Sequence, residues 1–547
     1  MLEDVQLVLL QRPGKDPNSP SAYRPIYLVN EVGKLFERVL MSRITEYLDN
    51  VGPDIHVHQY GFRLGRSTIY AINGVKCIAE GAVKQGGVAL AVSVNIVNAF
   101  NSMPWGAIGE GLTSHGLPNY MKKIIASYLA GRTTEFSGRS GLARRAIDRG
   151  VPQDSVLGRL LWNLRYDAVL HTALPIGVYV SCYADDTLLI ACGRKWTRTI
   201  RLMEVGLAVL AKKIANLGLE VAVQKTEAVW FHGLPQNRCP PASWIAVGGE
   251  RIPVGLSIKY LGLVLDGRLN FEAHFAQLVP RVEQVELSLC RIMPNSEGLK
   301  ERVRRLYASV TQSMILYGAP IWARENTLTR KNTNTLRSVQ RRIAIQLVRA
   351  YRTVSREAAI TLAGMIPFDH LARAYAEIYW RWREGDGQAQ ESPENQEFLK
   401  QRALRRARRR WKRELERTGA ASRRVAGAIL PNWEQWAESG PALLSHRITQ
   451  VLTGHGCFGE YLKRIGAETT AACHHCNADL DSAQHTLEVC EAFEEQRRAL
   501  TAVIGPDLSP AAIISALLAG DEKRKAVTSF CEEVISHKEA RKERESD

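Results

Sequence analysis

The chain of 547 residues is 45% hydrophobic and 23% charged, a composition that excludes an intrinsically disordered chain. At roughly 150 residues per domain, this length predicts three or four structural units. Its 72 Lys and Arg residues against 56 Asp and Glu residues give a formal charge of +16, which favours a polyanionic partner.

A basic chain would also suit an anionic membrane surface. However, no stretch approaches the ~18 apolar residues of a membrane span, and residues 1–4 (MLED) do not begin a signal peptide. We therefore expect an intracellular protein with no membrane partner. Seven of the ten cysteines stand singly, as expected for reduced and mostly buried thiols.

The first ~245 residues alternate short apolar strand-like runs with helical stretches, which predicts an α+β unit. From Glu272 to about Arg349 the pattern becomes helical, and residues 281–293 and 299–316 carry apolar residues at three- and four-residue spacing. Residues 385–397 (GDGQAQESPENQE) lack large apolar side chains and predict a linker.

Residues 178–190 (VYVSCYADDTLLI) predict a β-hairpin, because two β-prone runs flank Asp185 and Asp186. Two adjacent carboxylates on a tight turn backed by apolar strands are costly unless a cation or partner neutralises them. Mg²⁺ is a natural candidate, since it takes carboxylates and substrate phosphates as ligands. The alternative is an exposed turn that happens to hold two Asp residues.

The YADD sequence at residues 183–186 resembles the palm hairpin of reverse transcriptases, and further blocks follow that family's order. They are YRPI with GKLFE (23–37), QYGFRLGRST (59–68), NAFNS (98–102), GVPQ with SVLG (150–158), GLE with KTE (218–227) and KYLG (259–262). Each block is weak alone, but the ordered set is highly specific. The block at 59–68 and LYGAPIW at 316–322 are similar to non-LTR retrotransposons of the long-interspersed-element type, especially those of arthropods.

The resemblance implies catalytic roles at three positions. Asp185 would be a metal ligand and Asp186 its supporting acid. Lys225 would lie near the leaving pyrophosphate as a candidate general acid.

The resemblance also implies substrate-binding roles. Arg63 would hold the incoming triphosphate, a bidentate task that suits a guanidinium. Phe100 would be the bulky gate that rejects a ribose 2′-hydroxyl, with plain core packing as the alternative, and Gln153 would line the nucleotide pocket. The turn that grips the primer would comprise Lys259, Tyr260, Leu261 and Gly262.

One metal-binding position departs from the family pattern. Polymerisation of this kind uses two Mg²⁺ ions ~4 Å apart, held by carboxylates from two strands. The second carboxylate should stand five residues before Phe100, and that position is Asn95. Strand alternation supports this register, because Val88, Leu90, Val92 and Val94 share one face while Asn95 lies on the other with Ala89, Ala91 and Ser93.

A neutral amide at a bridging position should weaken the two-metal site, because Mg²⁺ selects anionic oxygen. Asp154 and Arg159 further replace the Gly and Pro that the family pattern implies in the nucleotide-pocket block. The resemblance also implies an N-terminally truncated chain without the endonuclease domain of such elements. We expect the fold to persist and polymerase activity to be very low or absent.

Residues 399–415 predict a helix with positive charge around most of its circumference. Nine of the fourteen residues from Lys400 to Arg413 are Lys or Arg. Such blocks are often solvated faces or disordered tails. In this context we favour sequence-tolerant contact with an RNA or DNA backbone.

Cys473, Cys476, His485 and Cys490 have the ligand types and short spacing of a structural Zn²⁺ site. His474 and His475 lie inside the first Cys-Cys turn and are alternative ligands. Chance clustering of reduced thiols is the alternative to a zinc site. The resemblance favours zinc, because GHG at 454–456 lies in a segment like that before the C-terminal zinc finger of these elements.

The resemblance implies an α+β right-hand polymerase with fingers, palm and helical thumb, then a helical basic connector and a small C-terminal zinc-finger module. We expect fingers and palm over residues 1–245 and primer grip and thumb over 246–384. A linker and basic connector would span 385–440, and a zinc-finger-like domain would span 441–547.

By resemblance the function is RNA-directed DNA synthesis in the nucleus and cytoplasm, with an RNA template, a DNA primer and dNTPs. Three hypotheses remain open: an active polymerase despite Asn95, a catalytically dead relic that binds RNA and DNA, and a pseudogene translation that does not fold.

Overall fold

The computed structural model describes the chain except residues 1–3, 12–13, 15, 20–21, 139–140, 152–154, 236–237, 292–300, 325–327, 385–392, 418–422 and 547. Gln153 and Asp154, both predicted to lie in the nucleotide-pocket block, fall outside the described residues. Within the described part, no helix has the length and apolar character needed to cross a membrane.

The chain divides into two compact units, Met1–Ala273 and His274–Asp547. Strand β10 (Glu250–Gly255) pairs with β8 (Glu227–Phe231) and with β9 (Trp244–Val247), so residues beyond 245 complete the main sheet of the first unit. The first compact unit therefore extends beyond the boundary predicted at residue 245. Backbone pairing to β8 decides the boundary, and no composition change marks it.

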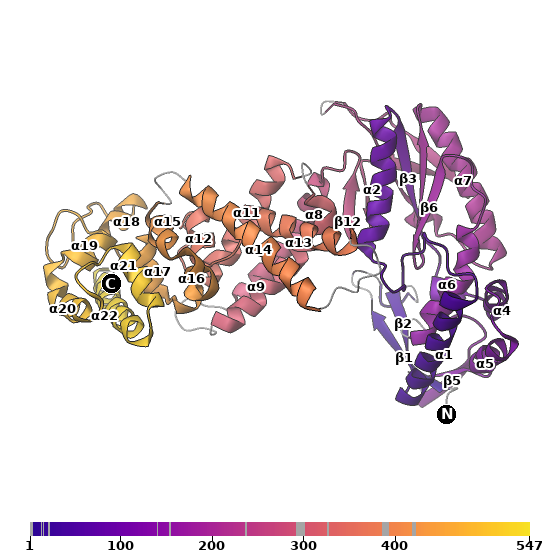
Figure 1. The fold of residues 1–547 in the computed structure, drawn as a ribbon, viewed down its shortest axis with the longest axis horizontal. Helices are drawn as coiled ribbons and strands as arrows, with labels where there is room; N and C mark the ends of the chain where they lie inside the picture. Colours follow the sequence, from indigo (N-terminus) through magenta and orange to yellow (C-terminus); the bar gives the residue numbers. More distant parts are fainter. Residues whose placement is uncertain are drawn as a thin grey trace. The chain divides into compact units, whose positions relative to one another are not determined.

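The first unit is built around a six-stranded sheet in the order β6-β7-β3-β8-β10-β9 (Figure 1). Its three remaining strands are β3 (Val88–Val94), β6 (Val178–Tyr183) and β7 (Asp186–Gly193). A four-stranded sheet, β2-β1-β4-β5, comprises β1 (Asp4–Gln11), β2 (Tyr23–Leu28), β4 (Thr133–Gly138) and β5 (Gly141–Ala146). A separate hairpin joins β11 (Ser257–Tyr260) to β12 (Leu263–Asp266).

Helices cover both faces of the six-stranded sheet. Helix α2 (Thr68–Lys84) contacts β3, β6, β7 and β8 on one face, and α7 (Trp196–Asn216) lies on the other (Figure 1). The other helices are α1 (Glu31–Asn50), α3 (Ala99–Ser102), α4 (Trp105–Ser114), α5 (Asn119–Leu129), α6 (Val156–Leu170) and the 3-10 turn η2 (Val223–Lys225).

The predicted alternation along β3 is confirmed. Val88, Leu90, Val92 and Val94 belong to the large apolar core that includes residues of α4 to α7, whereas the buried Ala89 and Ala91 do not. Small side chains on that second face suit close packing of α2. Because both faces of β3 are covered, a shift of one residue would turn the valines toward α2, where the small Ala89 and Ala91 side chains now pack, so the register is strongly specified.

Among its described residues the second unit contains helices and connecting loops and no strand. Its elements are α8 (Glu272–Cys290), α9 (Glu301–Leu316), α10 (Ala319–Trp322), α11 (Arg330–Leu347), α12 (Arg356–Leu362), α13 (Phe368–Glu384), α14 (Pro393–Glu416), α15 (Arg423–Ile429), η4 (Leu430–Asn432), α16 (Trp433–Ser439), η5 (Gly440–Leu443), α17 (His446–Thr453), α18 (Gly459–Arg464), α19 (Ala483–Glu488), η6 (Glu491–Phe493), α20 (Glu494–Ile504), α21 (Pro510–Leu518) and α22 (Asp521–Ser546). Helices α8 and α9 confirm the helical patterns predicted near 281–293 and 299–316. The predicted linker at 385–397 is partly wrong, because α14 begins at Pro393.

The predicted helix over 399–415 lies within α14, but the prediction that charge surrounds most of it is wrong. Ala403, Ala407, Trp411 and Leu415 recur every four residues and are buried. Ala403 and Ala407 pack against Ala374 of α13, and Trp411 joins a core shared with α12, α15 and the C-terminal helices. Small and apolar residues at this spacing make one stripe that a neighbouring helix can cover.

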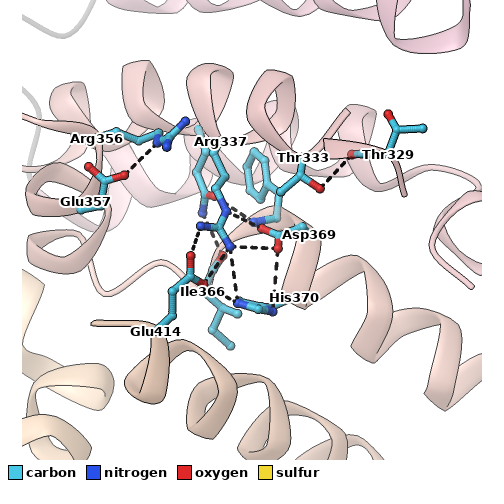
Figure 2. A network of polar contacts seen from close by, with 11 residues as sticks. Thr329, Thr333, Arg337, Arg356, Glu357, Ile366, Asp369, His370 and Glu414 are labelled. Carbon is cyan, nitrogen blue, oxygen red and sulfur yellow. Dashed lines mark hydrogen bonds and ion pairs between the residues drawn. The ribbon is translucent and has the colours of Figure 1, made fainter. Parts of the chain in front are cut away.

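An ion-pair network around Arg337 joins α14 to α11 and α13 (Figure 2). Arg337 donates to both carboxylate oxygens of the buried Asp369, at 2.8 and 3.0 Å, and its guanidinium also bonds Glu414. His370 Nε2 lies 2.9 Å from Glu414 Oε2. Hydrogen bonding to His370 and the charge of Arg337 lower the pKa of Glu414 to about 2. The network therefore stabilises the folded unit above about pH 4.5 and loses this contribution as pH falls toward 2.

Replacement of Arg337 by Met should lower the free energy of unfolding of the second unit by about 3 kcal/mol, because Asp369 would be left as an unpaired buried carboxylate. Hydrogen exchange of α13 and α14 amides measures this change locally. Arg498→Ala is the control, since Arg498 and Glu494 form an exposed pair, and it should change stability by less than about 0.5 kcal/mol. Equal effects of the two substitutions would contradict the assignment of Arg337 as a buried anchor.

Candidate active site and metal centre

The predicted carboxylate hairpin is present, with Asp185 in its turn. Strands β6 and β7 pair antiparallel up to Tyr183 opposite Asp186, so Ala184 and Asp185 form a two-residue loop. Ala184 adopts a left-handed φ of 57°, as a tight hairpin loop of this length requires. That conformation costs an L-residue about 1–2 kcal/mol unless its surroundings hold it.

Asn95 lies beside this hairpin. Strand β3 pairs with β7 through Val94 opposite Thr187, so the next residue, Asn95, comes opposite Asp186. Asn95 Nδ2 donates to the carbonyl oxygen of Lys225 at 3.2 Å, which also brings the predicted general acid to this corner. The Lys225 side chain is exposed. The structure thus assembles Asn95, Asp185, Asp186 and Lys225 from three separate segments.

The two carboxylates resist ionisation in the absence of a cation. Burial raises the pKa of Asp185, an effect that a backbone hydrogen bond and the charge of Arg24 partly oppose. Desolvation, followed by the charge of Asp185, raises the pKa of Asp186 to about 6, although Asp186 stands at an exposed position. Such a pair suits a divalent cation, because a bound charge of +2 would relieve both effects.

The donor set at this corner fits a Mg²⁺ site with two anionic residues and one neutral one. Asp185 and Asp186 offer carboxylate oxygens, whereas Asn95 offers only its amide Oδ1 once Nδ2 bonds Lys225. A carboxylate at position 95 would instead place negative charge near the Lys225 carbonyl oxygen. Asn95 therefore contributes a neutral oxygen to this corner, beside two anionic residues.

Phe100 lies on α3 in an aromatic row. Its ring centroid is 5.0 Å from that of the buried Trp162 and 6.2 Å from that of Phe62. Arg159, one of the departures from the family pattern, places its guanidinium 5.1 Å from the Phe62 ring centroid. Phe100 is half-buried against the core, so the gate role and core packing are both compatible with its position.

Arg63 is engaged by its own loop. Its Nη1 donates to the carbonyl oxygens of Ile55 and His56 at 2.9 and 3.0 Å, and its Nη2 pairs with Asp54. In this conformation the Arg63 guanidinium stabilises the segment before the QYGFR block through these bonds. Triphosphate binding by Arg63 remains a prediction that would require some of these bonds to be exchanged.

The predicted primer-grip residues form the tip of the β11–β12 hairpin. Leu261 and Gly262 both have positive φ, 46° and 86°, as in a type I′ turn. Lys259 is exposed, and its backbone N–H donates to Glu227 at 3.0 Å. Tyr260 is buried, with its hydroxyl 3.3 Å from that of Ser181 on β6, so this hairpin packs against the carboxylate hairpin.

Two buried polar residues matter here although no role was predicted for them. Glu37 on α1 is fully buried and accepts from the Val156 backbone N–H at 2.7 Å, which caps the first turn of α6. Gln59 is also fully buried and bonds the turn residue Ala184. Both lie within quoted sequence blocks, but a contact made across a long stretch of chain leaves no signal in spacing.

The predicted zinc ligands converge in the second unit. Ligand atoms of Cys473, Cys476, His485 and Cys490 all lie within 4.8 Å of one another. The Sγ atoms of Cys473 and Cys490 are 3.9 Å apart, too far for a disulfide but close to the ~3.8 Å expected for two thiolates on one tetrahedral Zn²⁺ with ~2.3 Å bonds. Cys476 Sγ lies 3.3 Å from His485 Nε2.

The two alternative histidines point elsewhere. His474 Nε2 lies 3.0 Å from a carboxylate oxygen of Glu468, and the His475 ring packs 5.2 Å from that of Phe493. Burial and the neighbouring Cys473 raise the pKa of the Cys490 thiol to about 12, so any cation bound here must displace a proton.

The sequence of the first unit decides the family. A model of the reverse transcriptase (RNA-dependent DNA polymerase) family matches residues 13–265, which include Asn95, both Asp residues of the hairpin and the primer-grip turn. Residues 13–265 of this chain therefore form a domain of the reverse transcriptase family, similar to those of non-LTR retrotransposons.

This chain has relatives in insect retrotransposons. It is 28% identical over 551 residues to a 115 kDa protein in the type-1 retrotransposable element R1DM of Drosophila melanogaster, an alignment that covers 97% of this chain and 51% of the relative. It is 27% identical over 507 residues to the Pol polyprotein of the type-1 retrotransposable element R1 of Bradysia coprophila, covering 90% and 48%. The chain thus spans about half the length of these relatives.

Solved structures with some likeness include telomerases of two Candida species. The Candida tropicalis apo enzyme gives a TM-score of 0.39 at 10% identity, covering 73% of this chain and 69% of that one. The Candida albicans enzyme with telomeric RNA gives 0.34 at 12% identity, covering 72% and 64%.

In EDTA at pH 7.5, the Asp186→Asn variant of this chain should unfold at a higher temperature than the parent chain. Near pH 4 the two chains should unfold at the same temperature. A carboxyl whose folded pKa is raised to about 6 destabilises the fold as pH rises from about 4 to 6, and the amide removes this cost. Calorimetry at the two pH values measures the difference. Glu250→Gln, at an exposed position in the same unit, is the control and should show no such pH dependence.

Proposed function

We propose that this chain is the RNA-directed DNA polymerase portion of a non-LTR retrotransposon protein, with polymerisation weakened or abolished by Asn95. The observation that supports this proposal is the β3–β7 register, which sets Asn95 opposite Asp186 at the carboxylate hairpin. In this proposal the six-stranded sheet is the palm and the four-stranded sheet belongs to the fingers. Helices α8 to α13 belong to the thumb proposed within residues 246–384.

The chemistry needs negative charge at all three positions. Two Mg²⁺ ions bound in such a site activate the attacking 3′-oxygen of a primer and stabilise the leaving oxygen. Asp185 and Asp186 would hold these ions, and Asn95 would contribute one neutral oxygen. Because Mg²⁺ demands near-ideal geometry and anionic ligands, the site should bind metal weakly and hold two ions poorly.

The remaining roles concern an RNA template, a DNA primer and a dNTP. Phe100 would screen the sugar, Arg63 and Gln153 would contact the nucleotide, and Lys225 would protonate the leaving pyrophosphate. The primer would rest on Lys259, Tyr260, Leu261 and Gly262. The tight turn at Leu261 and Gly262 supports this assignment, because it brings the backbone to a point beside the carboxylate hairpin.

A second candidate function is RNA and DNA binding without catalysis. The face of α14 opposite its buried stripe supports it, because Arg402, Arg405, Arg409, Arg410 and Arg413 are all exposed there. These residues span roughly three turns of helix, enough to contact several phosphates. Binding of this kind would be insensitive to sequence and would weaken steeply with salt.

The four-ligand cluster supports a structural Zn²⁺ site. Cys473 and Cys490 are buried in the same core as Leu487 and Phe493, so closure of the site would fix this core to α19 and η6. Its distances match one tetrahedral ion, and binding of that ion would release the thiol protons to solvent.

We expect metal analysis to find one Zn²⁺ per chain. The His485→Ala variant should lose most of this zinc, and the second unit should then unfold at a lower temperature. His474→Ala is the matched control, because that neighbouring ring faces Glu468, and it should retain zinc. Zinc affinity should fall as pH falls, since the metal competes with protons for thiols. Full zinc content in His485→Ala, or its loss in His474→Ala, would overturn the ligand assignment.

Primer extension on an RNA template with Mg²⁺ tests the catalytic proposal, with the parent chain compared to Asn95→Asp at equal concentration. Asn95→Asp should raise dNTP incorporation at least 100-fold, because it restores the missing anionic ligand. Asn95→Asp with Asp185→Asn is the control and should be inactive. Equal extension by the parent and Asn95→Asp would show that position 95 is not part of the metal site.

If neither chain extends the primer while both bind RNA and DNA at low salt, the second candidate function is the correct one. Binding that disappears when Arg405, Arg409 and Arg413 are replaced by Gln would assign it to α14. Replacement of the exposed Arg498 of α20 and of the exposed Lys523 and Lys525 of α22 by Gln removes the same charge elsewhere in the second unit and is the control.

A further inference from the structure

The segment 58–61 runs along the outer edge of the carboxylate hairpin. Strand β6 ends the six-stranded sheet, so one of its edges has no partner strand. Cys182 N–H donates to the His58 carbonyl at 3.0 Å, and Tyr60 N–H donates to the Cys182 carbonyl at 2.9 Å. These two bonds form a short parallel pairing, with Gln59 opposite Cys182. The segment therefore covers the edge at the strand end that leads into the turn.

The side chain of Gln59 reaches from this segment to the turn itself. It is fully buried, and its Oε1 accepts from the Ala184 N–H at 2.9 Å. Its Nε2 donates to the Ala184 carbonyl oxygen at 3.4 Å. One carboxamide thus engages both backbone groups of Ala184, the residue with a left-handed φ that directly precedes Asp185.

Gly61 permits this arrangement by close approach. A Cβ at Gly61 would lie 2.3 Å from Ala184 N, a distance that real side chains do not reach. Gly61 N–H also donates to Gln59 Oε1 at 3.0 Å, and its carbonyl accepts from Asn163 of α6 at 2.8 Å. The glycine is needed here because two backbones meet, since its own φ is not positive.

The start of the segment is fixed independently. His56 N–H donates to the buried Asp167 on α6 at 2.7 Å, and Arg63 bonds the Ile55 and His56 carbonyls. Asp167 also lies 3.0 Å from His171 Nε2 and 3.5 Å from His115 Nε2. Gln59 is therefore held between an anchored loop and the turn, so its carboxamide has little freedom to move.

We propose that Gln59 is a positioning residue for the metal site: its carboxamide fixes the Ala184 peptide groups and so sets the direction in which Asp185 presents its carboxylate. This inference rests on the proposed metal-binding function of Asp185 and Asp186. Without the clamp, the left-handed residue can relax, and the two carboxylates no longer converge on one cation. Gly61 is the second part of the same device, because any side chain there would push Ala184 away.

The test compares Gln59→Leu with a matched substitution elsewhere. Gln340, in the second unit, is also fully buried and bridges a backbone pair, donating to Ile366 and accepting from Phe368, both at 2.8 Å. Gln340→Leu should therefore carry a similar cost in stability. Gln59→Asn keeps a buried amide but is one methylene too short to span to Ala184, and it serves as a second variant if Gln59→Leu does not fold.

Two readouts are used on the full-length chain. Hydrogen exchange without metal should show lost protection at Ala184 in Gln59→Leu, with protection of the β7 amides retained. Mn²⁺ binding is followed by electron paramagnetic resonance, and only the binding that Asp185→Asn abolishes is counted. The affinity of this site for Mn²⁺ should weaken at least tenfold in Gln59→Leu and less than twofold in Gln340→Leu. Both readouts are made in the parent and in the Asn95→Asp background.

The outcomes separate the clamp from the proposed function. Unchanged protection of Ala184 in Gln59→Leu, or unchanged Mn²⁺ affinity despite lost protection, would overturn the positioning role. Equal weakening by Gln340→Leu would also overturn it, since the effect would then reflect global stability. If no Mn²⁺ binding at Asp185 is found even with Asn95→Asp, the proposed function fails, and the exchange readout alone still decides whether Gln59 holds the turn.

Discussion

The antiparallel pairing of β3 with β7 is the constraint on which the site depends. This pairing carries Asn95 to a position opposite Asp186, and it leaves no latitude, because helices bury both faces of β3. A register shift of one residue would turn the valines toward α2 and the small alanines toward the main core, so neither face would pack. The same packing explains why an Asn at position 95 is compatible with the fold. Its side chain lies at the end of the strand, where it bonds a backbone carbonyl outside the apolar core.

The pairing of β3 with β7 also determines which charged and neutral side chains meet at the carboxylate hairpin. Two neighbouring carboxylates lie at the end of an apolar sheet, where burial raises the pKa of both and the charge of Asp185 further raises that of Asp186. A third carboxylate would increase this cost in the absence of metal, whereas Asn95 replaces it with a hydrogen bond to Lys225. In the proposed metal site, Asn95 would thus favour the metal-free fold over cation binding.

In the second unit, packing brings together segments that differ in composition. Helix α14 carries a dense run of arginine, yet its Trp411 and Leu415 lie in one core with residues near the cysteine cluster. The Arg337 network then fixes the same helix to α11 and α13 through buried charges. The basic run is consequently one face of a packed helix, and this packing holds its exposed arginines in a fixed array.

The sequence by itself determined the local features: the Asp185–Asp186 hairpin, the alternation along residues 88–95, the helix at α14 and the set of four zinc-type ligands. Each of these depends on side-chain period, turn chemistry or short spacing, which neighbouring residues specify. Only the tertiary structure decided the unit boundary near residue 273 and the buried face of α14. It also decided that His474 and His475 lie outside the ligand cluster and that Gln59 bonds the backbone of Ala184. These depend on contacts between residues far apart in the chain, and such contacts leave no periodic or compositional trace.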